Sequence, residues 1–190
     1  MKAIILAAGL GSRLNEITKD KPKALVDVNK VTMLERVIVN LKNQGVNRFL
    51  INIHYLGQEI IDFLAKNNNF GVSIIISDER NRILDTGGAI LKARDFIAGS
   101  ESVIVHNVDI ISDININEIF DYHDKNNSLA TLCIRKRKSD RGLLFNSNMQ
   151  LVGWANTKKN KYKWVNNSIN DYNIFAFSGI YMITPEFVEL

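Results

Sequence analysis

The chain opens with the stretch Met1-Lys-Ala-Ile-Ile-Leu-Ala-Ala-Gly-Leu-Gly-Ser-Arg-Leu-Asn-Glu-Ile-Thr-Lys-Asp-Lys-Pro-Lys-Ala-Leu25, which decides how we interpret the rest. Its apolar run from Ala3 to Ala8 has the length of a buried strand. The run leads directly into two glycines, and three lysines follow around Pro22. Glycines let backbone N–H groups approach an anion closely, and nearby cations neutralise its charge. The stretch therefore predicts a phosphate-binding loop; the alternative is a tight strand-to-helix turn followed by a solvated basic loop.

Beyond this stretch, strand and helix patterns alternate as far as about residue 134. Further strands are expected over residues 48–53, 72–76, 102–106 and 129–134, and helices over 32–45, 58–68, 86–97 and 115–125. The first of these helices begins with Thr32 and Glu35 at capping-box spacing. Alternation of this kind, with nearly continuous apolar strands, is typical of a mostly parallel sheet covered by helices on both faces. We therefore expect a Rossmann-like α/β fold.

The pattern changes after residue 140 and becomes richer in β-structure. Strands are expected over residues 143–145, 151–154 and 175–183, with no helices between them. The polar stretch between Trp154 and Ile174 predicts an exposed loop or a hairpin. A helix has barely begun at Thr184-Pro185 when the chain stops at Leu190. We expect a single domain over residues 1–190 that is truncated at its C-terminus.

Composition narrows the class of protein. A chain of 190 residues with 46% apolar residues can bury a substantial core. Its net charge of +4 is concentrated near residues 19–23 and 135–138 and is not interleaved with aromatic residues, so we expect no nucleic-acid binding. The single cysteine, Cys133, excludes an internal disulfide and favours a cytoplasmic location. No stretch has the length and apolarity of a signal peptide or a membrane span.

The glycine motif fits neither of the two common nucleotide-binding patterns. A dinucleotide-binding motif needs a third glycine where this chain has Leu14, and an acidic residue near residue 53. A P-loop needs four residues between its glycines and then Lys-Ser or Lys-Thr. Arg13 points instead to side-chain contacts with a polyphosphate, because a guanidinium matches phosphate oxygens in two places.

Two later segments also have the chemistry of a nucleotide site. The apolar strand that begins near Ile104 ends in Asp109, a carboxylate that could hold Mg²⁺ at the carboxyl edge of the sheet. Its alternative role is to cap a turn into the next helix. Gly87 and Gly88 stand at the start of an expected helix, where a ligand could lie against bare backbone. Their alternative role is to form a tight helix start.

Together these motifs resemble the sugar-1-phosphate nucleotidylyltransferase family, whose opening signature is L-A-A-G-x-G-S/T-R-L followed by K-P-K-A/P-L. The matching segments, which cover essentially the whole chain, are Leu6–Leu14, Lys21–Leu25, Thr86–Gly88, the strand ending in Asp109, Gly142 and Phe177–Ile180. Within the family the chain is similar to N-acetylmuramate-1-phosphate uridylyltransferases and mannose-1-phosphate guanylyltransferases. Phosphocholine cytidylyltransferases share the same opening. The resemblance implies a GT-A-like fold.

The resemblance also implies a reaction and a set of site residues. An oxygen of a sugar 1-phosphate would attack the α-phosphorus of a nucleoside triphosphate, giving a nucleotide-sugar and pyrophosphate. The implied catalytic residues are Arg13 and Lys23, and the implied Mg²⁺ ligand is Asp109. The implied nucleotide-binding residues are Leu6, Ala7, Ala8, Gly9, Gly11, Ser12, Arg13, Gly87 and Gly88. The implied sugar-binding residues are Asn107, Gly142 and Ser178.

The chain departs from the family pattern in three places. Val108 stands where relatives have glycine, and a second metal-binding aspartate would lie beyond residue 190. The sugar-contacting Glu-Lys pair is not evident, although Lys158 or Lys159 could replace its lysine. A phosphocholine cytidylyltransferase and a non-catalytic nucleotide- or sugar-binding module therefore stay open as alternatives. The expected partners are a nucleoside triphosphate and a sugar 1-phosphate, without nucleic acid or membrane. The base, the sugar and the oligomeric state stay open, a homo-oligomer included.

Overall fold

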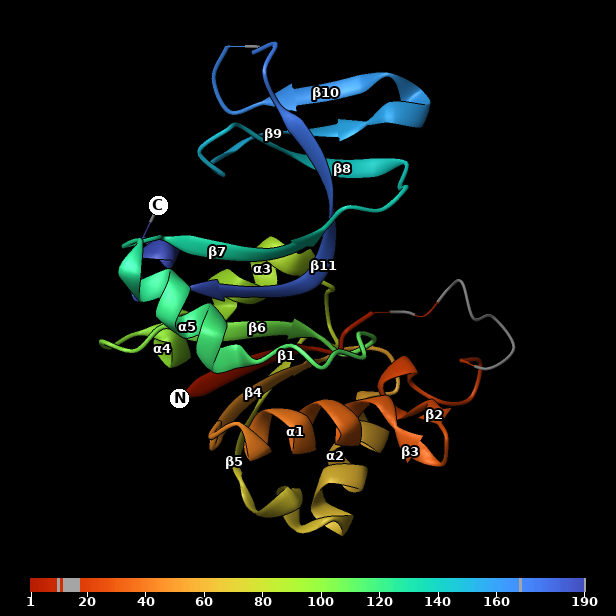
Figure 1. Ribbon diagram of the computed structural model, residues 1–190. Helices are drawn as coiled ribbons and strands as arrows, with labels where there is room; N and C mark the ends of the chain where they lie inside the picture. Colours follow the sequence, from red (N-terminus) through yellow and green to blue (C-terminus); the bar gives the residue numbers. More distant parts are fainter. Residues whose placement is uncertain (10, 12–17, 168, 190) are drawn as a thin grey trace. The chain divides into compact units, whose positions relative to one another are not determined.

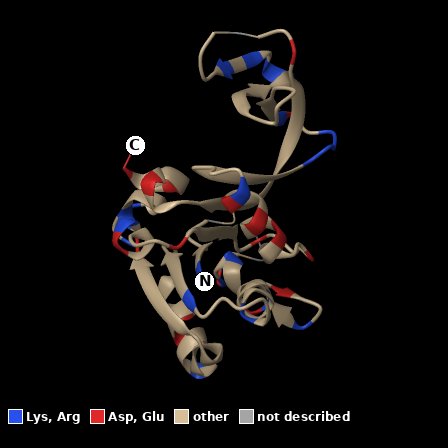
Figure 2. Ribbon diagram, turned by 60° about the vertical axis from the view of Figure 1, so that its left-hand side comes forward, with Lys and Arg blue, Asp and Glu red and all other residues tan. Residues whose placement is uncertain are grey.

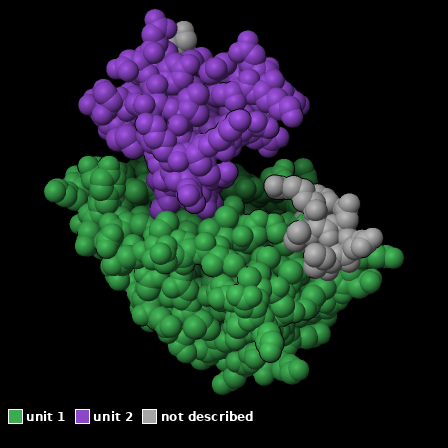
Figure 3. Space-filling view, turned by 45° about the vertical axis from the view of Figure 1, so that its right-hand side comes forward, with its two compact units in different colours: residues 1–131, 180–190 green, residues 132–179 purple. Residues whose placement is uncertain are grey.

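The computed structural model describes residues 1–9, 11, 18–167 and 169–189 (Figure 1). The chain divides into two compact units, which Figure 3 colours separately. Unit 1 comprises Met1–Thr131 and Ile180–Leu190, and unit 2 comprises Leu132–Gly179. The chain therefore leaves unit 1 once, builds unit 2, and returns.

Unit 1 is built around a parallel sheet. Its parallel strands are β1 (Lys2–Leu6), β4 (Arg48–Ile53), β5 (Ser73–Asp78) and β6 (Val103–Asn107), in the order β6-β1-β4-β5. The last residues of β11 (Asn173–Ile183) extend this sheet by pairing with β6 in the antiparallel direction. In the register, Leu6 lies opposite both Asn52 and Asn107. The predicted α/β fold is confirmed.

Helices connect these strands. They are α1 (Met33–Asn43), α2 (Gly57–Lys66), α3 (Asp85–Lys92), α4 (Arg94–Ile97) and α5 (Ile116–Lys125) (Figure 1). Right-handed crossovers place α1 and α2 on one face of the sheet and α3 and α4 on the other. The predicted cap is present, since the Thr32 hydroxyl accepts the Glu35 N–H at 3.1 Å. No described helix is long and apolar enough to cross a bilayer.

The sequence predicts one helix over residues 86–97, and this prediction is wrong in its continuity. The structure has two helices there, α3 and α4, with a break at Ala93. At Ala93 the backbone N–H is shared between the carbonyls of Ala89 and Ile90, both at 3.1 Å. Ala93 is buried, at 1% exposure. The turn therefore tightens at a small packed residue, where the sequence has neither glycine nor proline to mark the break.

The core of unit 1 follows from the apolar runs. The side chains of Ile4, Phe49 and Ile51 on the sheet and of Leu34 and Ile38 on α1 are fully buried. Each such side chain stabilises the fold by about 1.5 to 3 kcal/mol relative to an exposed one. This packing fixes the edge of the sheet from which the loops begin.

Unit 2 is antiparallel, so the prediction of a β-rich C-terminal part is confirmed. It contains β8 (Arg141–Phe145), β9 (Leu151–Asn156), β10 (Lys161–Trp164) and the first part of β11, and β7 (Ala130–Arg135) leads into it. The polar stretch after Trp154 forms a hairpin through a short 3₁₀ turn (Thr157–Lys159) and β10. Gly142 packs against β11, because a Cβ atom there would lie 2.3 Å from Ile174 Cγ2.

The two units differ in charge. Residues 132–179 include nine Lys and Arg but only two Asp and Glu, so the positive excess of the whole chain resides in unit 2. Figure 2 shows these basic residues along its loops and strands. Cys133 is half-buried there, and burial raises the pKa of its thiol to about 11. The thiol therefore stays protonated at neutral pH.

Candidate active site

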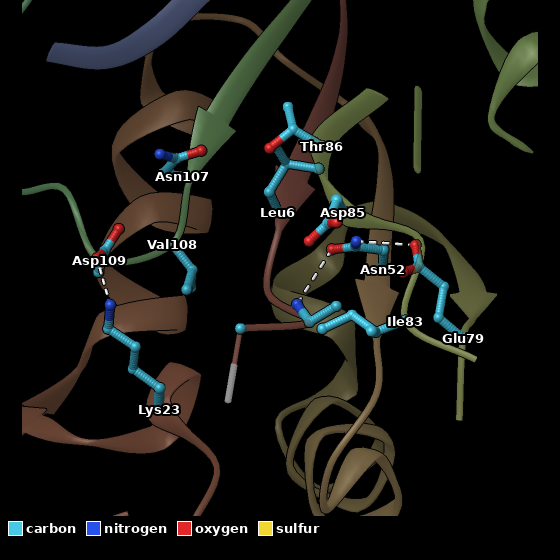
Figure 4. Close-up of a pocket in the computed structure, with 12 residues that line it drawn as sticks. Leu6, Lys23, Asn52, Glu79, Ile83, Asp85, Thr86, Asn107, Val108 and Asp109 are labelled. Atoms are coloured by element: carbon cyan, nitrogen blue, oxygen red, sulfur yellow. Dashed lines mark hydrogen bonds and ion pairs between the residues drawn. The ribbon is translucent and has the colours of Figure 1, made fainter. Parts of the chain in front are cut away.

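A cavity of about 220 Å³ opens at the carboxyl edge of the parallel sheet in unit 1. It is lined by Leu6, Ala8, Gly9, Lys23, Asn52, Glu79, Ile83, Asp85, Thr86, Asn107, Val108 and Asp109 (Figure 4). These residues lie at or just beyond the ends of β1, β4, β5 and β6. Ligands of open α/β sheets bind at this edge, so the cavity is the candidate active site.

One end of the cavity carries an ion pair. Lys23 begins a short 3₁₀ helix (Lys23–Leu25), and its Nζ donates a hydrogen bond to the carboxylate of Asp109. The two side chains are 20% and 34% exposed. Lys21 Nζ instead pairs with the Asp27 carboxylate at 2.8 Å. Asp27 is the first residue of a small hairpin formed by β2 (Asp27–Val28) and β3 (Val31–Thr32). Lys23 is therefore the lysine of this segment that lines the cavity.

Asp109 has the chemistry of a Mg²⁺ ligand. The Val108 N–H donates to the Leu6 carbonyl at 3.1 Å and carries the pairing of β6 one residue further, so Asp109 follows at the sheet edge. Val108 is buried at 4% exposure, so the side chain that replaces the family's glycine is accommodated. The described residues contain no group of three or more His, Cys, Asp or Glu that could hold a metal alone. A single carboxylate fits Mg²⁺, which is often held by one or two carboxylates together with substrate phosphates.

The other end of the cavity is fixed by a buried hydrogen-bond network. Asn52 Oδ1 accepts the backbone N–H groups of Ala7 at 2.7 Å and Ala8 at 3.2 Å. Asn52 Nδ2 donates to Glu79 Oε1 at 2.9 Å, and Glu79 Oε2 accepts the Leu84 N–H at 3.2 Å. Asn52 and Glu79 are only 4% and 2% exposed. The network therefore ties the loop after β1 to the loop before α3, since buried polar groups require partners.

Sequence reasoning missed Asn52 and Glu79. The signal for Asn52 was a polar residue inside the otherwise apolar segment Phe49–Ile53. A buried amide in a strand needs hydrogen-bond partners, so a polar residue at this position predicts a buried polar network around it. Glu79 gave no comparable signal, because an acidic residue just after a strand is common on protein surfaces.

The glycines of the predicted site have different local roles. A Cβ atom at Gly9 or Gly87 would meet no heavy atom within 4 Å, so both positions leave space for a ligand. A Cβ atom at Gly88 would lie 2.9 Å from the Leu84 Cβ, which explains a glycine there by packing. Gly11 has φ +66°, and a Cβ atom would lie 2.8 Å from Thr18. Its conformation thus favours glycine on backbone grounds.

The structure brings part of the predicted site together. The predicted residues that line the cavity are Leu6, Ala8, Gly9, Lys23, Asn107 and Asp109. Ala7 is buried beside it, while Gly87 and Gly88 are in the first turn of α3, next to Thr86. Ser12 and Arg13 lie outside the described residues. Gly142 and Ser178 belong to unit 2, where Gly142 is buried and Ser178 half-buried. The binding roles assigned to all of these residues stay predictions.

Two pKa values near the sheet edge are displaced. Burial lowers the pKa of His106, whose Nδ1 lies 2.7 Å from the Asn107 carbonyl oxygen. The imidazole is therefore neutral at neutral pH. The Arg80 guanidinium donates to the Asp78 carboxylate at 2.9 Å and lowers the pKa of Asp78 to about 2. Asp78, the last residue of β5, is thus an anion at neutral pH and is paired with Arg80, two residues further along the chain.

Comparison with known proteins assigns a family model to most of the chain. The model described as nucleotidyl transferase matches residues 2–143. An N-acetylmuramate alpha-1-phosphate uridylyltransferase of Neisseria meningitidis is 36% identical over 120 residues, which are 63% of this chain and 52% of that protein. A probable mannose-1-phosphate guanylyltransferase of Oryza sativa is 31% identical over 195 residues, with 100% of this chain and 51% of that protein covered. The chain spans about half the length of these relatives.

Solved structures agree with the sequence comparison. The chain is similar to HddC from Yersinia pseudotuberculosis in complex with GMP-PN, with a TM-score of 0.76 and 25% identity. The similarity covers 99% of this chain and 78% of that one. The likeness therefore extends across both units of the chain.

Proposed function

The chain belongs to the nucleotidyl transferase family, and on this basis we propose that it transfers a nucleotidyl group from a nucleoside triphosphate to a sugar 1-phosphate, with Mg²⁺ as cofactor. The products would be a nucleotide-sugar and pyrophosphate. One observation carries the proposal. Lys23 and Asp109, 86 positions apart in the sequence, meet at the edge of a cavity that the loop after β1 also lines.

The proposed reaction is an in-line displacement at the α-phosphorus. A bond forms between an oxygen of the sugar phosphate and this phosphorus, while the bond to the β-phosphate oxygen breaks and pyrophosphate leaves. Lys23 would hold the two anionic reactants close together by reducing their mutual repulsion. The open backbone at Gly9 would let the nucleotide approach the sheet edge. Arg13 stays the predicted contact of the departing pyrophosphate.

The proposed metal site rests on Asp109 and on oxygens of the substrates. When bound there, Mg²⁺ would neutralise charge on the phosphates and help to orient them. Asp109 would hold the cation, and Asn107 would lie beside it at the cavity wall. Lys23 would contribute a second, fixed positive charge.

We test the proposed function by measuring pyrophosphate release. The panel pairs UTP, GTP, CTP and dTTP with mannose 1-phosphate, N-acetylmuramate 1-phosphate, glucose 1-phosphate and phosphocholine. At least one triphosphate with one sugar phosphate should react, and EDTA should stop the reaction. If CTP with phosphocholine is the only pair of the panel that reacts, the cytidylyltransferase alternative is favoured. Binding of a nucleotide without turnover by any pair would favour a binding module.

Removal of the Lys23 charge should strengthen divalent-cation binding at Asp109. The two side chains pair in the structure, so a cation must compete with the lysine for the carboxylate. A partly exposed ion pair contributes up to about 1 kcal/mol, so Lys23→Ala should bind Mn²⁺ up to roughly fivefold more tightly. Electron paramagnetic resonance of free Mn²⁺ measures this change directly. Asp109→Asn should do the opposite, and equal affinities in all three proteins would contradict the proposed cation site.

A further inference from the structure

Asp85 has an unusual backbone conformation at the cavity. It is the first residue of α3, and its φ is +55°, in the left-handed region. A residue with a side chain is held there at a cost of roughly 1 kcal/mol, although aspartate tolerates the region better than most. Asp85 is exposed and lines the cavity. Within the described part of the chain, its carboxylate takes part in neither a hydrogen bond nor an ion pair.

The position of Asp85 separates it from the charged end of the cavity. Figure 4 shows it beside Leu6, Thr86 and Asn52, whereas Lys23 and Asp109 lie on the other side. If the phosphates of a bound nucleotide lie against Lys23 and against a Mg²⁺ ion held by Asp109, the base of that nucleotide lies at the end of the cavity where Asp85 is. This step rests on the proposed function. The apolar side chains of Leu6 and Ile83 at the same end offer a surface for a flat ring.

Two carboxylates line this end, and only one is available to a ligand. Both oxygens of Glu79 already accept hydrogen bonds, from Asn52 and from the Leu84 N–H. Glu79 is also buried, at 2% exposure. Asp85 is therefore the carboxylate that can accept a hydrogen bond from a base. An ionised carboxylate only accepts, so it selects a base by the N–H groups that the base presents.

We propose that Asp85 is a specificity-determining residue that accepts the ring N–H of a keto base, so that the site takes a uracil, thymine or guanine nucleotide. Uracil and thymine present N3–H and guanine presents N1–H, each beside a carbonyl. The first turn of α3 has backbone N–H groups without an acceptor inside the helix, and these suit that carbonyl. In the same pose, cytosine and adenine would place a bare ring nitrogen against the Asp85 carboxylate, which repels its lone pair, and would turn their exocyclic amine toward the backbone N–H groups, which are donors too. The site would therefore disfavour CTP and ATP.

The test is nucleotide binding by isothermal titration calorimetry with the full chain. The titrated nucleotides are UTP, dTTP, GTP, CTP, ATP and two methylated probes, N3-methyl-UTP and N1-methyl-GTP. The wild type should bind at least one keto nucleotide roughly tenfold or more tightly than CTP and ATP. The loss of one hydrogen bond to a charged group lowers an affinity by about this factor. Methylation of the ring nitrogen of that nucleotide should remove the preference. Asparagine and glycine both tolerate a positive φ, so Asp85→Asn and Asp85→Gly keep the backbone conformation. In both variants the affinities for the keto nucleotide and for CTP should differ by less than about threefold.

Asp95→Asn is the matched control, because Asp95 is an exposed acidic residue outside the cavity. It should bind every nucleotide like the wild type. An unchanged ratio in both Asp85 variants, or tighter binding of CTP by the wild type, would overturn this inference and leave the proposed function intact. If the wild type binds no nucleotide at all, the proposed function fails, and the inference fails with it.

Discussion

Lys23→Ala should lower kcat roughly 100-fold or more in the nucleotidyl transfer reaction. The loss of one preorganised electrostatic contact to a transition state has an effect of this size. The backbone of Lys23 is held by a 3₁₀ turn, which a 2.8 Å hydrogen bond from the Leu25 N–H to the Pro22 carbonyl closes, and its Nζ is held by the ion pair with Asp109. The charge is thus held in place before the substrates bind. Single-turnover kinetics with saturating nucleotide would separate this effect on chemistry from an effect on binding.

The segment supplies its own control for this prediction. Lys21 is two residues away, is exposed, and pairs with Asp27 rather than with a cavity residue. Lys21→Ala should therefore change kcat less than about twofold, because exposed ion pairs contribute little. Lys23→Arg should restore activity only in part, since a guanidinium differs from an ammonium in shape and reach. Equal activity of folded Lys23→Ala and wild type would remove Lys23 from the catalytic machinery.

Asn52→Ala should destabilise the protein by about 2 to 4 kcal/mol and weaken nucleotide binding. The substitution leaves the buried N–H groups of Ala7 and Ala8 without their acceptor and removes a donor to Glu79. Each unsatisfied buried group costs about 1 to 3 kcal/mol, and neighbouring losses are not fully additive. Because Ala7 and Ala8 lead into the predicted phosphate loop, the affinity for nucleotide should fall together with stability. Urea denaturation and calorimetric titration measure the two effects.

Two further variants show whether the network itself is responsible. Asn52→Asp keeps an acceptor for the Ala7 and Ala8 N–H groups but places a second carboxylate against Glu79, so it should also destabilise. Asn117→Ala, on the exposed face of α5, should be neutral within about 0.5 kcal/mol. A neutral Asn52→Ala would show that the network does not support the loop.

Much of the fold, and the position of Asp109 in the candidate site, could be predicted from the sequence. The strand over residues 48–53 coincides with β4, because a short apolar run between turn signals has few other structures available. Asp109 could be placed at the cavity because parallel strands end at a common edge of the sheet. Thr32 could be placed as a cap because its partner Glu35 is only three residues away.

The remaining features depend on contacts between distant segments. Nothing in the local sequence links Asn52 to Glu79, and their hydrogen bond exists only because β4 and β5 are neighbours. The positive φ of Asp85 is also invisible in the sequence, since aspartate is a common first residue of helices in an ordinary conformation. The ion pair between Lys23 and Asp109 could not be predicted from local sequence for the same reason. Asp109 stands out by its place at the end of a strand, and the family resemblance selects Lys23 among the three lysines.

The central position of β1 has a consequence for the order of folding during synthesis. Strand β1 is flanked by β4 and by β6, and the second of these neighbours begins about 100 residues after β1, with Val103 opposite Lys2. At the usual 5 to 20 residues per second, the apolar strand waits roughly 5 to 20 s for that neighbour. Until then, one edge of β1 is open to pairing with other chains. Lys23 therefore meets Asp109 only when the ribosome has made more than half of this chain.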